Sequence, residues 1–547
     1  MNPLIIGINA KYIHTNNAIR LLKANSLHAI DIQEFTIKDS INTIVNYIIN
    51  RNPLFVGFST YIWNVEMIKR LTQQLRTLSD VPIILGGPEV SYDGDYFLTN
   101  THADMIVKGE GEHIIDDVIE HFKTQKTLQN TPSIQTKTIN NPILENKHLD
   151  TLNTPHRFES DTPMVKNRIM YIESSRGCPY QCSYCLSSLE KTVRFFDIEH
   201  VKSDIQYLLD QGAKTFKFLD RTFNANTQAI EIIDFIIKHH TKGSVFQFEM
   251  TGDTLDETLV DYIHANSPKG LFRFEIGIQS THPITNELVG RIQNNNKLFH
   301  MINKLIDAKI VDLHLDLIAG LPKENLTRFK QTFNEVFDLG AKELQLGFLK
   351  MLRGTRIRKN APLYDYHFSE KAPYEIISNH CLSEEDISTI KKVETMLEIF
   401  HNKHYFDDTL FTILQSFTSN YFDFFNDLYD AYFKANLPRI GYQIEPLYRF
   451  INNYLHDLTI EPASLEPLKH TYLARAKTKP KPFFEKITDK KQRKSIIETV
   501  SNTHNISEAK LYKNALITHY KTGYLVALYD KHQSYLYFVK NNPSYSV

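Results

Sequence analysis

The sequence predicts an α/β protein with three successive parts: an N-terminal doubly wound parallel sheet, a central partial barrel of six strand–helix units, and a mainly helical C-terminal part ending in short strands. Three observations support this prediction. Short apolar runs alternate with amphipathic helical patterns from residue 4 to about residue 122. The same alternation recurs between residues 168 and 348. From about residue 373 the chain becomes helical and rich in aromatic residues.

The N-terminal part, residues 1–125, contains five strand-like runs: Leu4–Asn9, Ile30–Thr36, Leu54–Ser59, Ile83–Gly86 and Asp104–Lys108. Helical patterns separate them, as in Asn64–Leu78, where apolar residues recur every three or four positions. Strands that alternate with helices predict a flavodoxin-like parallel sheet with helices on both faces. Residues 126–165 are polar and interrupted by prolines, which predicts a linker.

Three loops of the N-terminal part suit a ligand, because ligands of doubly wound sheets bind at the carboxyl ends of the strands. They hold Ser59-Thr60-Tyr61 with Trp63, Gly86-Gly87-Pro88-Glu89, and Gly109-Glu110. Paired glycines let a backbone approach a large ligand, although any such sheet needs glycines in its turns. Trp63, the only tryptophan, suits either a cover for a planar ligand or a place in the core.

The central part, residues 166–370, contains six further runs: Arg168–Ser174, Thr215–Leu219, Val245–Met250, Phe272–Gln279, Leu313–Ile318 and Glu343–Phe348. They predict a partial α/β barrel, in which functional groups gather at the C-terminal ends of the strands. Cys178, Cys182 and Cys185 follow the first run, at that end.

The three cysteines are spaced CxxxCxxC and offer three thiolates to one metal centre. Four would complete a [4Fe–4S] cluster, so three leave one iron open to a substrate. A structural zinc ion would need a fourth ligand, and neither His200 nor Cys381 continues a zinc pattern. Four cysteines in 547 residues without a secretory leader argue against disulfides. A single catalytic thiol leaves the spacing unexplained, so a cluster is the favoured interpretation.

The cysteine segment, with Tyr184 before the third cysteine, resembles the signature of the radical S-adenosylmethionine (SAM) enzymes. The resemblance implies that SAM binds the open iron and is cleaved by an electron to a 5′-deoxyadenosyl radical. It implies that Asp220 accepts the SAM ammonium and that Arg291 pairs with the carboxylate, although ordinary ion pairs would also explain both. The implied SAM contacts are Tyr184, Asp220, Glu275, Gln279, Ser280, Arg291, Ile318, Gly320 and Leu321. Lys323 replaces a glycine of the adenine turn, which predicts a less extreme backbone there.

The glycine-bearing loops together resemble the cobalamin-binding domain that precedes many radical SAM cores. The resemblance implies a set of cobalamin contacts: His14, Ser59, Thr60, Tyr61, Trp63, Gly86, Gly87, Pro88, Glu89, Gly109 and Glu110. One departure concerns His14, because the aspartate and the glycine that accompany a cobalt-ligating histidine in this family are missing. Base-off cobalamin without a histidine ligand is therefore favoured.

The C-terminal part, residues 371–547, ends in three strand-like runs, Ala515–Tyr520, Tyr524–Tyr529 and Tyr535–Val539. It resembles an extension of uncharacterised function found in one group of cobalamin-binding radical SAM proteins. The basic stretch from Arg475 to Lys494 suits a solvated linker better than an RNA-binding module. Cys381 is expected to pack as a buried apolar residue.

The composition predicts a cytoplasmic protein. A formal net charge of −1 gives no general attraction to nucleic acid or membranes, and no apolar run approaches the roughly 20 residues of a membrane span. The resemblance implies methyl transfer to an unactivated carbon, with a flavodoxin- or ferredoxin-type electron donor. Other cobalamin-assisted rearrangement or ring formation, and a non-catalytic cobalamin sensor, stay open. RNA methylthiotransfer needs three further thiolates, and only Cys381 remains. The substrate cannot be read from the sequence.

Overall fold

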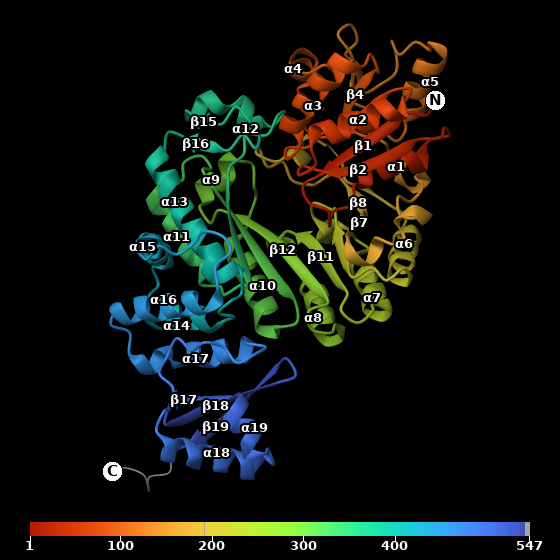
Figure 1. The fold of residues 1–547 in the computed structure, drawn as a ribbon. Coiled ribbons are helices and arrows are strands. Elements are labelled where there is room, and N and C mark those ends of the chain that lie inside the picture. Colours follow the sequence, from red (N-terminus) through yellow and green to blue (C-terminus); the bar gives the residue numbers. More distant parts are fainter. Residues whose placement is uncertain (191, 542–547) are drawn as a thin grey trace. The chain divides into compact units, whose positions relative to one another are not determined.

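The computed structural model describes residues 1–190 and 192–541, and it confirms the predicted α/β fold class (Figure 1). The described chain divides into two compact units. The first contains residues 1–332 and 346–387, and the second contains residues 333–345 and 388–547. The expected boundary between residues 370 and 371 therefore differs from the boundary between the two units. Residues 333–345, from the end of the barrel region, belong to the second unit.

A six-stranded sheet in the order β2-β1-β3-β4-β5-β6 forms the centre of the N-terminal domain. Its strands are β1 (Leu4–Asn9), β2 (Asp31–Thr36), β3 (Val56–Ser59), β4 (Ile83–Gly86), β5 (Met105–Val107) and β6 (Ile134–Gln135). The helices between them are α1 (Asn17–Asn25), α2 (Ile41–Arg51), α3 (Val65–Leu78), α4 (Gly94–Asn100) and α5 (Ile115–Thr124). The first five strands are parallel, and β6 pairs with β5 in the antiparallel direction.

Two hydrophobic clusters cover the two faces of this sheet. Ile44 of α2 and Leu71 of α3 belong to the cluster on one face, and Ile19 of α1 and Val118 of α5 belong to the cluster on the other. The alternation of strand side chains between faces explains why Ile5 belongs to one cluster and Ile6 to the other. The sheet is therefore doubly wound, as the sequence predicted.

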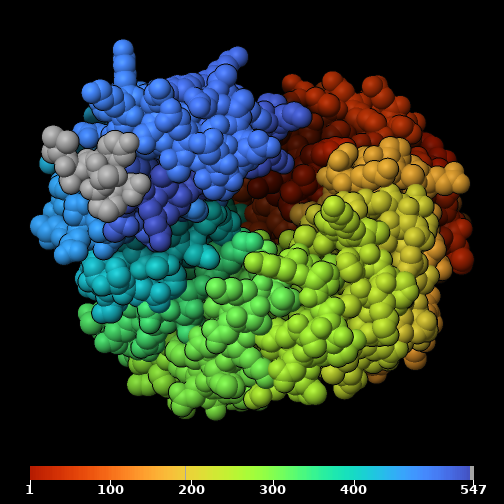
Figure 2. Space-filling model, turned by 90° about the horizontal axis from the view of Figure 1, so that it is seen from below, coloured from red at the N-terminus to blue at the C-terminus, as the bar shows by residue number. Residues whose placement is uncertain are grey.

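The connecting segment, residues 126–165, is more ordered than the predicted linker. It contributes β6 and the 3₁₀ turns Leu149–Thr151 and Glu159–Asp161. Ile134 is fully buried in one of the sheet clusters, which explains why a two-residue strand is fixed here. Figure 2 shows the orange surface of this segment between the red surface of the N-terminal domain and the yellow surface of the first barrel helices.

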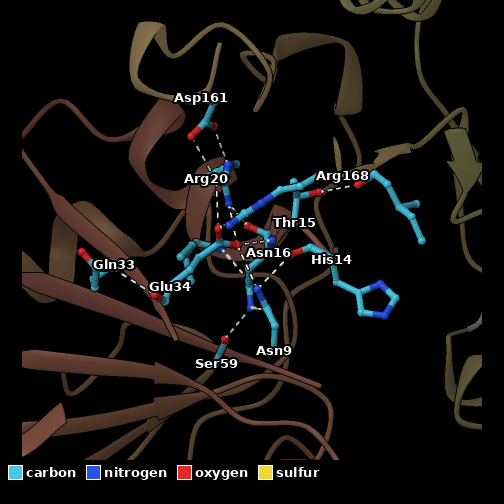
Figure 3. A network of polar contacts seen from close by, with 12 residues as sticks. Asn9, His14, Thr15, Asn16, Arg20, Gln33, Glu34, Ser59, Asp161 and Arg168 are labelled. Atoms are coloured by element: carbon cyan, nitrogen blue, oxygen red, sulfur yellow. Dashed lines mark hydrogen bonds and ion pairs between the residues drawn. The ribbon is translucent and has the colours of Figure 1, made fainter. Parts of the chain in front are cut away.

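A buried ion network joins the N-terminal domain, the connecting segment and the first barrel strand (Figure 3). Glu34 accepts hydrogen bonds from Arg20 (2.9 Å), from the backbone N–H of Asn16 (2.6 Å) and from Arg168. Arg20 also pairs with Asp161 at 2.7 Å. Burial alone would raise the pKa of Glu34, but Arg20 and Arg168 hold it at about 2.

The barrel sheet has the order β14-β13-β12-β11-β10-β7. Its strands are β7 (Ile169–Ile172), β10 (Thr215–Phe218), β11 (Val245–Met250), β12 (Phe272–Gln279), β13 (Asp312–Ala319) and β14 (Glu343–Phe348). The accompanying helices are α6 (Ile198–Asp210), α7 (Ala229–His239), α8 (Glu257–Asn266), α9 (Pro283–Leu288), α10 (Asn295–Ala308), α11 (Leu326–Phe337) and α12 (Arg356–Lys359). Short pairs β8 (Ser175–Arg176) with β9 (Arg194–Phe195), and β15 (His367–Phe368) with β16 (Ile376–Ser378), complete this unit.

Alternate residues of the barrel strands have opposite environments. In β12 every second side chain is fully buried, including Phe272 and Phe274, whereas Glu275 and Gln279 between them are partly exposed. Figure 1 shows α7, α8 and α10 along the outer side of the sheet. The phenylalanines therefore pack under the helices, and the polar residues face the inside of the barrel.

The second unit is helical and ends in a small sheet. Its helices are α14 (Thr409–Phe417), α15 (Tyr421–Lys434), α16 (Ile444–Asp457), α17 (Pro462–Arg475), α18 (Lys490–His504) and α19 (Glu508–Asn514), with most of α13 (Glu384–Leu397). The sheet consists of β17 (Ala515–Tyr520), β18 (Gly523–Asp530) and β19 (Gln533–Lys540). Phe333 and Phe337 pack on Tyr421 and Phe422, which explains why residues 333–345 belong here. No helix in the described residues is long and apolar enough to span a membrane.

Candidate active site

The cysteine loop begins directly after β7 and is fixed by the neighbouring strand end. Asp220, which follows β10, is fully buried and accepts the backbone N–H and the hydroxyl of Ser174 (3.0 and 2.5 Å) and the hydroxyl of Ser175 (2.6 Å). Burial raises the pKa of Asp220 to about 6, against the lowering effect of these hydrogen bonds. The oxygens of Asp220 hold the start of the cysteine loop, and its expected contact with SAM stays a prediction.

The three cysteine side chains belong to one short loop, and all three are free thiols. Burial raises the pKa of the Cys178 thiol, and the nearby sulfurs of Cys185 and Cys182 raise it further. The hydrogen bond with the Thr222 side chain lowers this pKa and so opposes both effects. The backbone of the loop is held from outside: the N–H of Ser183 donates to the Val289 carbonyl at 2.7 Å. The side chains thus remain available for ligation while the backbone is fixed.

The sulfur arrangement fits a cluster better than one zinc ion. In residues 1–190 and 192–541, no group of three or more His, Cys, Asp or Glu side chains is placed to hold a single metal ion. A zinc ion needs all its ligands at about 2.0–2.3 Å from one point. A [4Fe–4S] cluster offers a separate iron to each cysteine, so its three thiolates stand farther apart.

Four of the expected SAM contacts lie at the open end of the barrel. Arg291 is placed with its Nη1 4.0 Å from the Cys182 sulfur, and it donates to the Gly277 carbonyl. Gln279 has φ +66°, and its Oε1 is buried without a hydrogen-bond partner. Glu275 accepts a hydrogen bond from Lys217 (2.8 Å), and burial raises the pKa of the Tyr184 hydroxyl. An unpartnered buried amide oxygen at the end of β12 fits a bound polar ligand.

The adenine side of the expected SAM site is only partly exposed. Ile318 is half-buried on the inner face of β13, and Gly320 has φ +98°. Leu321 is fully buried in the core, and the hydroxyl of Ser280 donates to the buried Glu324 at 2.7 Å. The side chains of Leu321 and Ser280 therefore contribute to the fold, and their expected SAM contacts stay predictions.

The backbone expectation at Lys323 is wrong. Lys323 has φ +62°, in the left-handed region that favours glycine. The turn adopts the left-handed conformation even though a lysine occupies the position, and the lysine side chain is exposed.

One cavity of about 840 Å³ joins the barrel mouth to the N-terminal domain. Its lining from the barrel is Tyr171, Glu173, Ser175, Arg176, Gly177, Leu186, Ser187, Glu190, Leu219, Arg221 and Leu352. The loops after β1, β3, β4 and β5 form the opposite wall, including His14, Ser59, Tyr61, Trp63, Gly86, Gly87, Pro88, Glu89, Gly109 and Glu110. Most of the expected cobalamin contacts thus share a cavity with residues adjoining Cys178.

The cavity continues as an apolar slot between the sheet and helices α1 and α5. Ile5, Phe55, Gly57, Ile84 and Val118 line it. Gly57 belongs to a buried strand, and a Cβ there would lie 2.7 Å from Ile5 Cδ1. Gly57 was not among the expected cobalamin contacts, although an isolated glycine inside a strand signals close approach of another group. A slot of this shape and polarity fits the nucleotide tail of a base-off cobalamin.

The aromatic pair Tyr61 and Trp63 forms a flat surface in the cavity wall. Their ring centroids are 4.3 Å apart with an interplanar angle of 6°, and the Trp63 indole N–H donates to the Ile8 carbonyl at 3.0 Å. Burial raises the pKa of Tyr61 to about 12, so the phenol stays neutral. Thr60 is fully buried and its N–H donates to the Gly86 carbonyl at 2.7 Å, which ties two loops together.

The carboxylates of the glycine loops bind to arginines of the barrel. Glu110 lies 3.2 Å from Arg176 and 2.9 Å from Arg194, and Glu112 lies 2.8 Å from Arg176. Glu173 adds a third carboxylate to Arg176 at 2.9 Å. Burial works to raise the pKa of Glu110, but both arginines hold it below its usual range. Local patterns did not predict this cluster, because Glu110 and Glu112 are more than sixty positions away from Arg176 and only Glu173 is near it in the chain.

His14 joins the N-terminal domain to the edge of the barrel. Its Nδ1 lies 2.7 Å from the Tyr171 hydroxyl, and residue 14 forms a parallel β-bridge with Ile169. Burial lowers the pKa of His14, and Lys11 and Lys217 lower it further. The His14 side chain thus contacts the first barrel strand through Tyr171.

Comparison with known families identifies the domains. Residues 3–119 match the B12 binding domain, residues 172–336 match the radical SAM superfamily, and residues 363–531 match a family described as a protein of unknown function, DUF4080. The chain is a B12-binding radical SAM protein. Its cofactors are a [4Fe–4S] cluster, SAM and cobalamin. Cys178, Cys182 and Cys185 would hold the cluster, and the cavity with its apolar slot fits the corrin.

Two curated proteins and one solved structure illustrate what this chain is similar to. The 2-(S-pantetheinyl)-carbapenam-3-carboxylate methyltransferase of Streptantibioticus cattleyicolor is 20% identical over 53% of this chain and 46% of that enzyme. The cobalamin-dependent radical SAM methyltransferase TokK of Streptomyces tokunonensis gives the same three values. The chain thus spans about half the length of these relatives. The structure of OxsB, a cobalamin-dependent SAM radical enzyme, with aqua-cobalamin bound has a TM-score of 0.61 at 13% identity, covering 92% of this chain and 82% of that one. It shows the shared fold.

Proposed function

We propose that the protein is a cobalamin-dependent radical SAM methyltransferase that acts on an unactivated carbon of a substrate held in the barrel mouth. The observation that carries this proposal is the single cavity of about 840 Å³ that both domains line. Arg176 and Gly177, next to the cysteine ligands, and Gly86 and Gly109, in the corrin loops, face the same space. A methyl group and a radical generated in one cavity can meet on one substrate without crossing solvent.

When bound, the cluster supplies an electron to SAM, and cobalamin supplies a transferable methyl group. The residues of this chain orient these groups. Arg291, beside Cys182, offers a cation to the SAM carboxylate, and Gln279 offers an unpartnered amide oxygen. Gly86 and Gly87 keep the corrin loop free of side chains, and a Cβ on Gly87 would lie 2.6 Å from the Thr60 carbonyl oxygen.

The charged groups around the cavity pair with one another, which supports the exclusion of water from the cavity. The guanidinium of Arg176 is 11% exposed and is neutralised by three carboxylates. Buried ion pairs of this kind fix geometry, because breaking one leaves an uncompensated charge. They would keep the cysteine loop and the corrin loops at a constant separation during turnover.

The proposal extends to the setting of the enzyme. All four cysteines are free, which supports a reducing, cytoplasmic location. A flavodoxin- or ferredoxin-type protein would supply the electron. Rearrangement or ring formation with the same cofactors, and a sensor without turnover, are the alternatives that the experiment below separates.

The test is anaerobic reconstitution with iron, sulfide and hydroxocobalamin, followed by incubation with SAM and a reductant. We expect 5′-deoxyadenosine to form, and S-adenosylhomocysteine to form with it once a substrate is supplied. A protein that retains all cofactors and yields no deoxyadenosine would be a sensor. Deoxyadenosine with product but without S-adenosylhomocysteine would indicate rearrangement or ring formation and would overturn methyl transfer.

A further inference from the structure

A strap of residues 361–382 contacts loops of both expected cofactor sites. It begins within two residues of the start of the DUF4080 match, and it contains β15 and β16. Tyr366, Tyr374 and Asn379 of the strap are polar yet 7%, 0% and 8% exposed. Buried polar side chains need hydrogen-bond partners. The partners of these three lie on the turn after β13 and on the loop after β4.

One end of the strap holds the turn expected beside adenine. The Gly320 carbonyl accepts the Tyr366 hydroxyl at 2.8 Å and the Asn379 amide at 3.1 Å. A Cβ on Gly320 would lie 2.7 Å from Ile376 Cδ1, so the strap also fills the space beside this glycine. Asn379 is itself fixed, because its Oδ1 accepts the N–H of Leu382 at 2.9 Å. Two donors on one carbonyl orient the peptide plane of the turn.

The other end of the strap holds the loop after β4, which lines the cavity. The Tyr374 hydroxyl donates to Glu89, and Arg353 Nε donates to the Tyr374 hydroxyl at 3.1 Å. Arg353 Nε also lies 3.5 Å from Glu89 Oε1. Glu89 is 3% exposed, and its backbone N–H donates to the Thr60 carbonyl at 3.4 Å. The strap hydroxyl therefore holds the Glu89 side chain, and the Glu89 backbone in turn holds the loop that contains Thr60.

Backbone hydrogen bonds connect the two ends. The Met351 N–H donates to the Tyr374 carbonyl, the Ile376 N–H donates to the Leu349 carbonyl, and the Leu349 N–H donates to the Ala319 carbonyl, each at 2.9 Å. Ala319 adjoins Gly320. The peptide of Tyr374 is thus linked to the adenine turn through a continuous series of ordered backbone groups, with no flexible side chain between them.

We propose that Tyr366, Asn379 and Tyr374 are positioning residues that hold the SAM turn and the corrin loop in one frame, so that cobalamin and SAM each strengthen the binding of the other. This assigns a role to the first part of the DUF4080 region, and it rests on the cofactor pair of the proposed function. A ligand on one loop restricts the strap, which lowers the ordering cost at the other loop. Linkage requires the effect to be equal in both directions.

The experiment measures SAM binding without turnover. Iron-reconstituted full-length protein is dialysed anaerobically against radiolabelled SAM, with and without saturating hydroxocobalamin and with no reductant. We expect the SAM dissociation constant of the wild type to fall at least fivefold when cobalamin is bound, the lower limit of ordinary coupling between sites. Cobalamin titrations followed by absorbance should show the same factor when SAM is added.

Tyr374→Phe should reduce the effect of cobalamin on the SAM dissociation constant to below about twofold. The substitution removes the hydroxyl that donates to Glu89 and keeps the aromatic ring. Tyr366→Phe should raise the SAM dissociation constant about three- to tenfold, the usual effect of one hydrogen bond. The matched control is Tyr432→Phe, which removes a buried hydroxyl that donates to the Pro438 carbonyl in the second unit. It should leave both dissociation constants unchanged. If Tyr366→Phe does not fold, Asn379→Asp replaces it, since it removes the amide donor and keeps the oxygen.

The inference is overturned if cobalamin leaves the SAM dissociation constant of the wild type unchanged, or if Tyr374→Phe keeps the full factor. These outcomes are separate from the fate of the proposed function. Coupled binding in a protein that forms no methylated product would sustain the inference and remove the methyltransferase proposal. Methylated product without coupled binding would overturn the inference and sustain the methyltransferase proposal.

Discussion

The cysteine loop and the glycine loops face the same cavity, but they use their side chains in opposite ways. In the cysteine loop the side chains form no disulfide and are themselves the expected ligands, whereas the backbone is held by neighbouring segments, as when Ser183 donates to Val289. In the glycine loops the side chains are bound and the backbone lines the cavity. Glu89 accepts the Tyr374 hydroxyl and Glu110 pairs with Arg176, whereas Gly86 and Gly87 are bare.

The difference follows from what each loop must hold. An iron atom is ligated by thiolates, so the side chains themselves are the site. A corrin is large and mostly needs space and shape, so glycines supply the site and the charged neighbours are free to join domains. Side-chain substitutions should therefore abolish cofactor binding in the first loop and mainly alter stability around the second.

The largest effect is expected in the cysteine loop. Cys182→Ala should lose the cluster and all deoxyadenosine formation, because two thiolates cannot hold a site-differentiated [4Fe–4S] cluster. The measurement is iron and sulfide content after anaerobic reconstitution, with Cys381→Ala as the matched control that keeps full iron. Stoichiometric iron in Cys182→Ala would contradict the ligand assignment.

Arg176→Met tests the glycine-loop side of the comparison. It leaves Glu110, Glu112 and Glu173 without their shared cation, which should lower the free energy of unfolding by about 3–5 kcal/mol. Urea denaturation followed by circular dichroism measures this. Lys494→Met breaks an exposed pair with Glu498 and should cost at most about 0.5 kcal/mol. Equal losses of unfolding free energy in the two variants would show that the Arg176 ion cluster stabilises the fold no more than an exposed ion pair does.

Glu34→Gln extends the comparison to the second ion network between the domains. The folded pKa of Glu34, about 2, is below its ordinary value of 4.5. Its stabilising contribution is therefore complete above about pH 4.5 and is lost as the pH falls towards 2. The wild type should lose about 3 kcal/mol of its stability advantage over Glu34→Gln across this window. Urea midpoints at several pH values test this, and a constant difference would refute it.

The smallest effect is expected at His14. Because the aspartate and the glycine that accompany a cobalt-ligating histidine in this family are missing around His14, His14→Ala should leave the absorbance spectrum of bound cobalamin unchanged and its dissociation constant within about twofold. The lost hydrogen bond with Tyr171 should lower stability by about 1 kcal/mol. A shift of the cobalamin spectrum in this variant would indicate that His14 is a cobalt ligand. The corrin loops would then also bind their cofactor through a side chain.

Local patterns predicted most of the secondary structure. The bounds of β1, β4, β11, β12 and β14 agree with the expected runs to the residue, because buried strands have sharp apolar limits. The short strand β6 was missed, since two residues carry no periodicity. The SAM contacts of Asp220 and Ser280, implied by the resemblance, stay predictions, and local patterns did not show that hydroxyls and a carboxylate from distant segments bind their polar atoms.

The sequence by itself determined the chemistry of the cluster and the order of the domains. Cysteine spacing is local, and strand and helix periods are properties of short windows. The tertiary structure alone decided which polar groups meet: Glu110 with Arg176, His14 with Tyr171, and Tyr374 with Glu89. These pairs are separated by 66 to 285 positions in the chain, and only the burial of both partners makes their pairing obligatory. The cavity they enclose is therefore a product of the fold.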